Sequence, residues 1–156
     1  MVELVEVSDL HRAAIASGTD ALASLLGLKV PDGWPVYPDI FNRPGDRDWP
    51  LFLFVDPGQS SIVGSGGFLG APDSNGFVQI GYEVAPEYRG RGMATRAMLE
   101  VVSRRPGARL AAVVAPANLP SIAVLCKLGF RDTGQIIRRG DEALSLWVNA
   151  RPAIQA

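Results

Sequence analysis

The segment best suited to chemistry is YEVAPEYRGRGMAT, residues 82–95. A short strand leads through a Pro-containing turn into a glycine-bearing loop, and a helix opens directly after it. The first turn of a helix leaves its N–H groups unpaired and carries a partial positive charge. Gly90 and Gly92 allow a close backbone approach because they have no Cβ atom. The pattern favours a diphosphate-binding loop, although such a Gly-x-Gly is more often a tight turn.

Two well-known phosphate-binding motifs do not match this loop. It lacks the Gly-x-x-x-x-Gly-Lys-Ser/Thr pattern, so no P-loop lysine is available for a terminal phosphate. It also lacks Gly-x-Gly-x-x-Gly after a first strand with an acidic residue about twenty positions later. The sequence therefore gives no support for a P-loop or a dinucleotide fold.

A second segment, NLPSIAVLCKLGF at residues 118–130, adds the information that the loop alone lacks. Together with RGRGMA at residues 89–94 it resembles the GNAT superfamily of acetyl-coenzyme-A-dependent N-acetyltransferases. That family's loop reads Gln/Arg-x-x-Gly-x-Gly/Ala, and its later segment pairs an Asn and a Ser or Ala with a closing Leu-Gly-Phe. The resemblance covers about residues 48–149. The segment IGYEVAPEYRGRGMAT is most similar to the branch of the family that contains the ribosomal-protein N-terminal acetyltransferases.

The resemblance implies an α+β fold with a mixed, mostly antiparallel central sheet flanked by about four helices. Strands four and five of that fold splay apart, and the pantetheine arm enters the gap between them. Residues 77–84 and 110–115 would form this wedge. The chain is expected to be a single domain over residues 1–156, because its length is typical of one domain.

The same resemblance implies acetyl-CoA as co-substrate. No metal is expected, because His11 is the only histidine and a multi-histidine metal site is hard to assemble. The backbone at Val84 would bond the pantetheine amides, and the loop would wrap the pyrophosphate. The implied cofactor-binding residues are Val84, Arg89, Gly90, Arg91, Gly92, Met93, Ala94, Thr95, Asn118 and Ser121. For holding the pyrophosphate, the backbone donors should matter more than the side chains of the two arginines. Arg91 could equally be a solvated loop residue that does not contact phosphate.

Catalysis needs a group that takes a proton from the amine and a group that reprotonates the thiolate. Glu83 is the candidate base, at the end of the expected fourth strand. Alternation places Tyr82 and Glu83 on opposite faces, so either could face the cleft. Many family members carry a Tyr acid where this chain has Leu125 and Cys126. Ser121 is then the candidate acid, or the thiolate leaves unassisted.

Two functions follow from these residues. The first is transfer of an acetyl group from acetyl-CoA to a primary amine, either a protein N-terminus or a small molecule, by direct attack in a ternary complex. The alternative is a GNAT-fold module that senses acyl-CoA without turning it over. A longer acyl donor also remains open.

Composition limits the partners and the compartment. Fifteen basic and sixteen acidic residues leave a net charge of −1, so no overall field favours nucleic acid or an anionic membrane. No apolar run approaches the roughly 20 residues that span a bilayer. The lone Cys126 suits a reducing compartment. We expect a cytoplasmic monomer or homodimer that binds acetyl-CoA and an amine acceptor.

Periodicity predicts the other elements of the chain. Ser8 and Thr19 are expected to cap two short helices that break at Gly18. Strands are expected at 2–7, 51–55, 62–69, 77–84, 110–115, 130–138 and 142–148, and later helices at 92–105 and 120–128.

The Pro- and Gly-rich loop at residues 30–50 carries Trp34, Tyr37, Phe41 and Trp49, which could line an acceptor pocket or form a hydrophobic cluster. Its acids could recognise a cationic amine or be simply solvated; they are Asp32, Asp39, Asp46 and Asp48. Cys126 is expected to be a small core residue. His11, the only histidine, lies away from the motifs.

Overall fold

A seven-stranded mixed sheet forms the centre of the molecule in the computed structural model, which describes residues 1–149. Its strand order is β1-β2-β3-β4-β5-β7-β6. All neighbouring strands are antiparallel except β4 and β5, which run parallel. The mixed, mostly antiparallel sheet predicted from the sequence is thus confirmed. The strands are β1 (Glu3–Glu6), β2 (Leu51–Asp56), β3 (Ser61–Phe68), β4 (Phe77–Val84), β5 (Arg109–Val114), β6 (Phe130–Arg139) and β7 (Glu142–Asn149).

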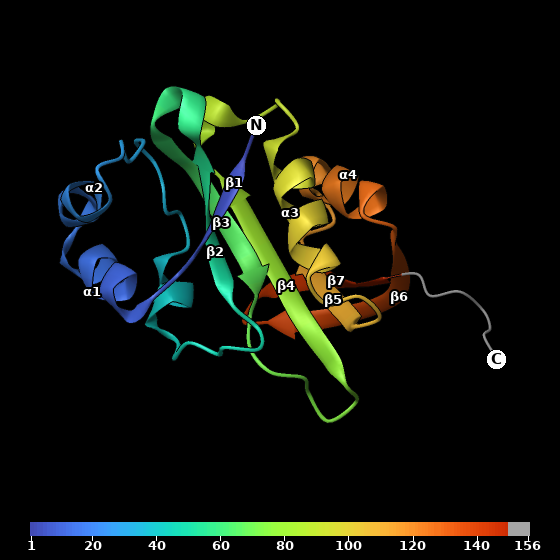
Figure 1. Cartoon of the computed structure of the whole chain (residues 1–156). Coiled ribbons are helices and arrows are strands. Elements are labelled where there is room, and N and C mark those ends of the chain that lie inside the picture. The colour runs from blue at the N-terminus through green and yellow to red at the C-terminus, as the bar shows by residue number, and fades with distance from the viewer. Residues whose placement is uncertain (150–156) are drawn as a thin grey trace.

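Helices flank the sheet on both sides (Figure 1). The N-terminal pair α1 and α2 lies beside β1–β3, and α3 and α4 lie on the other side of the sheet. None of the helices described for residues 1–149 has the length and hydropathy of a membrane-spanning segment. The α-helices are α1 (Asp9–Ser17), α2 (Thr19–Leu26), α3 (Met93–Ser103) and α4 (Leu119–Lys127), and short 3₁₀ helices are η1 (Pro38–Asn42), η2 (Pro57–Gln59) and η3 (Pro86–Tyr88).

The start of α1 is capped as the sequence predicts. The Ser8 hydroxyl accepts a hydrogen bond from the His11 N–H, and the His11 Nδ1 accepts one from the Ser8 N–H. His11 therefore completes a capping box. The second helix, α2, is also present as predicted, but its predicted N-cap was wrong: Gly18 and not Thr19 is the N-cap, and no side chain caps the helix. Gly18 has φ 131°, a backbone conformation that glycine adopts without a steric penalty.

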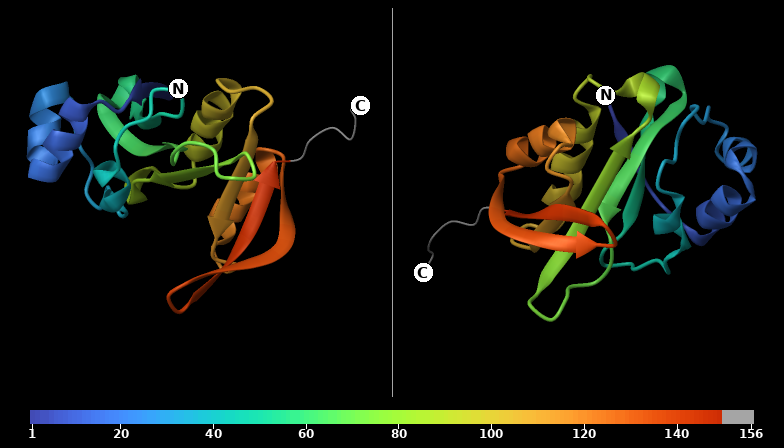
Figure 2. Two further views of the ribbon diagram at one scale, coloured as in Figure 1. Left: turned by 90° about the horizontal axis from the view of Figure 1, so that it is seen from below. Right: turned by 180° about the vertical axis from the view of Figure 1, so that it is seen from behind.

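The decisive feature of the sheet is the short contact between its two halves. Strands β4 and β5 pair only at residues 77–79 with 109–111, although β4 continues to Val84 and β5 to Val114. Beyond residue 79 the two strands diverge. Figure 2 shows β6 and β7 extending away from the β1–β4 half of the sheet. The splayed pair predicted from the sequence is confirmed.

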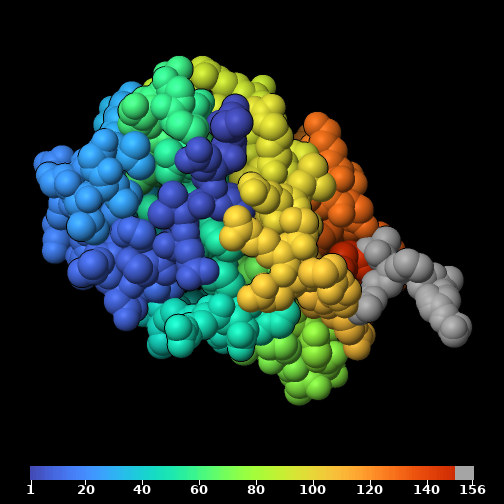
Figure 3. All heavy atoms as spheres, in the orientation of Figure 1, coloured from blue at the N-terminus to red at the C-terminus, as the bar shows by residue number. Residues whose placement is uncertain are grey.

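One part of the core lies between the sheet and α3. One face of α3 buries Met93, Ala97, Met98 and Val101, the amphipathic spacing expected from the sequence. The space-filling view shows α3 (yellow) covering the sheet between the N-terminal segment and α4 (orange) (Figure 3). In α4 the buried position is Leu125, whereas its neighbour Cys126 is exposed. The expectation of a core cysteine was wrong, because successive helical residues point in different directions.

Glycines in β3 make room for large side chains on neighbouring strands. Gly66 is the register partner of both Phe52 and Tyr82. A Cβ atom at Gly66 would lie 2.7 Å from the Gly81 carbonyl oxygen and 2.8 Å from the Tyr82 Cβ. Because one of these atoms belongs to the backbone, no side-chain movement alone could relieve the contact. Gly66 therefore lets β4 and Tyr82 approach β3 closely.

The Gly66→Ala variant should be destabilised by about 1–3 kcal/mol, the usual cost of overpacking a well-packed core. Chemical denaturation followed by far-UV circular dichroism measures this change. Gly58→Ala in the exposed η2 turn is the matched control. A Cβ there would meet only the Asp56 Oδ1, a side-chain atom 3.3 Å away that can move, so the unfolding free energy should change by less than about 0.5 kcal/mol. Equal stability of the Gly66→Ala variant and the wild type would show that β3 does not need a glycine there.

Candidate active site

A cavity of about 600 Å³ opens where β4 and β5 separate. Its walls come from the end of β4, the loop before α3, the first turn of α3 and one side of α4. All the site residues predicted from the sequence line it except Arg91. The lining residues are Val36, Tyr37, Tyr82, Glu83, Val84, Tyr88, Arg89, Gly90, Gly92, Met93, Ala94, Thr95, Asn118, Pro120, Ser121, Ala123, Val124 and Lys127.

The loop before α3 presents a run of free backbone donors. Gly90 and Gly92 have φ 77° and 73°, left-handed conformations that most other residues avoid. Within residues 1–149, no intramolecular acceptor is found for the N–H groups of residues 90–95, and the first helical bond runs from the Arg96 N–H to the Gly92 carbonyl. Successive free N–H groups at a helix start form an anion-binding concavity. This geometry suits a diphosphate.

The arginines around the loop hold its backbone. Arg89 folds back, and its Nε donates to the Val84 carbonyl over 2.9 Å. Arg91 lies with its guanidinium carbon 5.6 Å from the centre of the Tyr88 ring and does not line the cavity. Arg96, which sequence reasoning missed, donates from Nη2 to the Arg91 carbonyl over 2.9 Å. These side chains stiffen the loop and add positive charge beside it.

Asn118 and Ser121 meet at the start of α4, and both line the cavity. Asn118 is the N-cap of the helix, and its side-chain oxygen accepts a hydrogen bond from the Ser121 N–H over 3.3 Å. Pro120 follows at the second helical position, where a missing N–H costs nothing. The two polar residues predicted from the motif are thus brought to the cavity wall by the cap itself.

Tyr82 bridges β4 and α4 across the cavity. Its hydroxyl donates to the Ser121 carbonyl over 2.8 Å and accepts from the Ser121 hydroxyl over 3.0 Å. Burial raises the pKa of the Tyr82 phenol from 10.0 to about 12, although the hydrogen bond from Ser121 acts in the opposite direction. Tyr82 is therefore a neutral hydroxyl at physiological pH, held against Ser121.

Glu83 faces the opposite side of β4, where the long loop of residues 30–50 crosses the strand. Its Oε1 accepts from the Val36 N–H over 2.8 Å, and its Oε2 accepts from the Tyr37 N–H over 3.2 Å. Each carboxylate oxygen keeps a second lone pair that no N–H occupies. Alternation therefore separates Tyr82 and Glu83 as expected, yet both side chains line the same cavity.

Of the aromatic residues in the long loop, some pack in a hydrophobic cluster and one lines the cavity, the two roles expected from the sequence. Trp34 and Phe41 are buried in edge-to-face contact, and the Trp34 Nε1 donates to the Ser65 hydroxyl over 3.0 Å. Trp49 packs edge-on against Phe68. Tyr37 instead lines the cavity and is 67% exposed. The loop's four aspartates do not line this cavity.

Sequence reasoning missed several residues of the cavity wall. Val36 and Tyr37 come from a loop without a readable motif, and only the folded chain brings them to Glu83. Lys127 lies on the same face of α4 as Pro120 and Ala123, which come seven and four residues before it, so helical spacing could have pointed to it. Tyr88 lies inside the segment of residues 82–95, directly before RGRGMA, and its aromatic character in a polar turn was an available signal.

Replacing Tyr82 with Phe should remove one ionisation step centred near pH 12 from the alkaline absorbance titration of the folded protein. The pKa of Tyr82 in the folded protein lies above the ordinary value of 10.0. The contribution of the neutral phenol to the unfolding free energy is therefore fully present below pH 10. That contribution falls as the pH rises from about 10 to about 12, by at most roughly 3 kcal/mol.

The measurement for stability is the difference in unfolding free energy between wild type and Tyr82→Phe at several pH values. It should be constant up to pH 10 and shrink above it. The ionisation step that wild type shows and Tyr82→Phe lacks could instead be centred at pH 10 in a protein shown to be folded there. That result would contradict the buried position of the Tyr82 hydroxyl.

Comparison with known proteins agrees with this geometry. A family model described as an acetyltransferase (GNAT) domain matches residues 34–131. The uncharacterized N-acetyltransferase YjdG of Bacillus subtilis is 33% identical over 90 residues, which are 55% of this chain and 54% of that protein. The chain thus matches about half the length of this curated relative.

Solved structures extend the likeness over most of the chain. RimJ of Mycobacterium smegmatis, solved in complex with CoA-disulfide, is 25% identical with a TM-score of 0.63, covering 94% of this chain and 80% of that one. Ribosomal-protein-S5-alanine acetyltransferase of Vibrio fischeri shares the fold, with 18% identity, a TM-score of 0.66 and coverage of 99% and 96%. Since the family model spans more than half of the sequence, the chain belongs to the GNAT acetyltransferase family.

Proposed function

We propose that the chain transfers an acetyl group from acetyl-CoA to a primary amine by direct attack in a ternary complex. The observation that carries this proposal is the run of free N–H groups at residues 90–95, which opens into the gap between β4 and β5. A pyrophosphate accepts hydrogen bonds from such donors, and the helix dipole of α3 adds to the attraction.

The pantetheine arm would run along the free edge of β4. The Val84 carbonyl faces this gap and already accepts one bond from Arg89. A carbonyl oxygen has two lone pairs, so a pantetheine amide can share it. Asn118 uses its side-chain oxygen for the helix cap, and within residues 1–149 its NH₂ group makes no hydrogen bond. That NH₂ group is free to donate to pantetheine.

Glu83 is the proposed base. An ammonium cannot attack a thioester, so its proton must pass first to a carboxylate, directly or through one water. The two N–H groups of Val36 and Tyr37 fix the Glu83 carboxylate at the cavity wall and leave one lone pair free on each oxygen. The neutral amine nitrogen then bonds to the acyl carbon, and the carbon–sulfur bond breaks with its electron pair going to sulfur.

Tyr82 and Ser121 are the proposed source of the proton for the departing thiolate. The Ser121 hydroxyl donates to the Tyr82 hydroxyl, which donates to the Ser121 carbonyl. If the serine hydroxyl turns toward sulfur, it can pass its proton on and recover one from the phenol. The phenolate left on Tyr82 then takes, through water, the extra proton that the nitrogen carries once it has bonded to the acyl carbon, and Glu83 releases its proton to solvent. Tyr82 of β4 would then serve in place of the Tyr that the resemblance leads one to expect near Leu125, whose side chain is fully buried.

The acceptor would approach Glu83 beside the exposed side chains of Val36 and Tyr37, which are 48% and 67% exposed. These residues form an apolar lip at the cavity mouth. Such a lip suits an amine with an apolar neighbouring group, whether a protein N-terminus or a small molecule. The donor is proposed to be acetyl-CoA.

Release of free thiol from acetyl-CoA in the presence of a panel of small primary amines and N-terminal peptides tests the proposal. The Glu83→Gln variant should lose about 10²–10⁴-fold in kcat with the best acceptor, because an amide cannot take the proton. Its affinity for acetyl-CoA should stay within about twofold of wild type, since no proposed cofactor contact involves that carboxylate.

Glu142→Gln, at the exposed β6–β7 turn, is the matched control and should keep wild-type turnover. Full activity of the Glu83→Gln variant would remove Glu83 from the mechanism. Tight binding of acetyl-CoA without thiol release with any amine or peptide would replace the enzyme proposal with an acyl-CoA sensor.

A further inference from the structure

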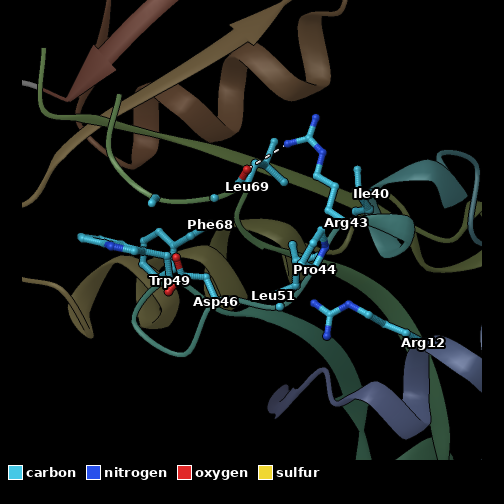
Figure 4. Close-up of a pocket in the computed structure, with 12 residues that line it drawn as sticks. Arg12, Ile40, Arg43, Pro44, Asp46, Trp49, Leu51, Phe68 and Leu69 are labelled. Carbon is cyan, nitrogen blue, oxygen red and sulfur yellow. Dashed lines mark hydrogen bonds between the residues drawn. The ribbon is translucent and has the colours of Figure 1, made fainter. Parts of the chain in front are cut away.

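A second cavity, of about 340 Å³, lies at the C-terminal end of β3 and shares no lining residue with the first. Its walls come from α1, η1, residues 43–49, the start of β2 and the end of β3. Figure 4 shows Arg12 reaching from α1 toward Leu51 and Pro44, while Arg43 extends toward the Leu69 carbonyl. The acetyl transfer proposed above uses none of these groups.

Arg12 is a largely buried cation with little to balance its charge. Its side chain is 14% exposed, and its Nη1 donates to the Val7 carbonyl over 3.3 Å. The carboxylate of Asp9 lies 3.9 Å from Nη1, but that side chain is fully exposed to solvent. The Arg12 Nε is buried and, within residues 1–149, has no hydrogen-bond partner.

An unpaired buried N–H on a charged group is costly, because water no longer solvates it and no acceptor replaces water. A solvated partner such as Asp9 contributes little. Asp46 also lines the cavity, but its Oδ1 accepts from the Asp48 N–H and it forms no ion pair with Arg12. The guanidinium therefore lacks the acceptor that its burial calls for. Arg43 adds a second positive charge at the same cavity.

The rest of the wall is mostly apolar and includes flat surfaces. The Trp49 and Phe68 rings pack edge-to-face with centroids 5.3 Å apart. The apolar lining comprises Ile40, Pro44, Trp49, Leu51, Phe68 and Leu69. A cavity of this size with apolar walls and a few polar groups is typical of a small-ligand site.

We propose that this cavity binds a small organic anion, a carboxylate or a phosphate monoester. Its anionic group accepts hydrogen bonds from the Arg12 guanidinium, and its apolar body rests against Trp49 and Phe68. A planar guanidinium matches both oxyanions with paired donors, so the chemistry is common to the two ligand types.

The test is a titration of the ¹⁵N-labelled full chain, following the side-chain Nε–H resonances of its arginines. Benzoate and phenyl phosphate are the two anionic probes, and benzyl alcohol is the neutral comparator. Coenzyme A is present throughout to occupy the first cavity. We expect a saturable shift of the Arg12 Nε–H with at least one anion and at least about tenfold weaker binding of benzyl alcohol.

Variants assign the binding to the guanidinium. Arg12→Met, which keeps the apolar stem, should weaken anion binding by at least about tenfold, and Arg12→Lys should lose less because it keeps the charge. Arg139→Met, at the exposed end of β6, is the matched control and should bind like the wild type. Since the resonance is followed in the wild-type protein, the test stands even if Arg12→Met fails to fold.

The relative affinities of benzoate and phenyl phosphate distinguish a carboxylate ligand from a phosphate ligand. An unmoved Arg12 Nε–H at millimolar concentrations of both anions would overturn the proposal. Equal binding of benzyl alcohol, or shifts confined to residues 89–95 of the first cavity, would overturn it as well.

Discussion

The separation of β4 from β5 is the constraint on which the rest of the structure depends. Backbone groups inside a protein need partners, and a strand edge that faces an internal gap lacks them. After residue 79 no strand pairs with the edge of β4 that faces β5. Arg89 binds the Val84 carbonyl, and Tyr82 spans the gap to Ser121 of α4. The same gap leaves an extended backbone edge beside the free N–H groups of residues 90–95, an arrangement suited to an extended ligand that ends in phosphate.

The long loop of residues 30–50 is held to the sheet at several points. Glu83 accepts the N–H groups of Val36 and Tyr37, and Trp34 donates to the buried Ser65. At its far end Arg105 donates to the Asp48 carbonyl over 2.7 Å. Tyr37, directly before η1, lines the first cavity, and Ile40 within η1 lines the second. One anchored segment thus contributes to the proposed acceptor side and to the proposed anion site.

The sequence predicted those parts of the site that depend on short-range pattern. Gly90 and Gly92 signal a backbone conformation, and Asn118 with Ser121 signals a helix start, so both could be read from local spacing. Contacts between distant segments could not. Glu83 and Val36 are 47 residues apart, and Tyr82 and Ser121 are 39 apart, so no local rule relates them. Thr19 and Cys126 were wrongly placed, because a glycine can start a helix and because helical position decided burial.

The most direct test of a phosphate-binding loop at residues 90–95 is calorimetric titration of three proteins with acetyl-CoA: wild type, Gly92→Trp and Gly107→Trp. Both glycines have positive φ, 73° and 80°, so both variants carry similar backbone strain, but only Gly92 lines the cavity. We expect binding in the micromolar range by wild type and Gly107→Trp, and at least about a tenfold loss in Gly92→Trp. No binding to a folded wild type, or equal binding by all three proteins, would contradict a phosphate-binding loop at residues 90–95.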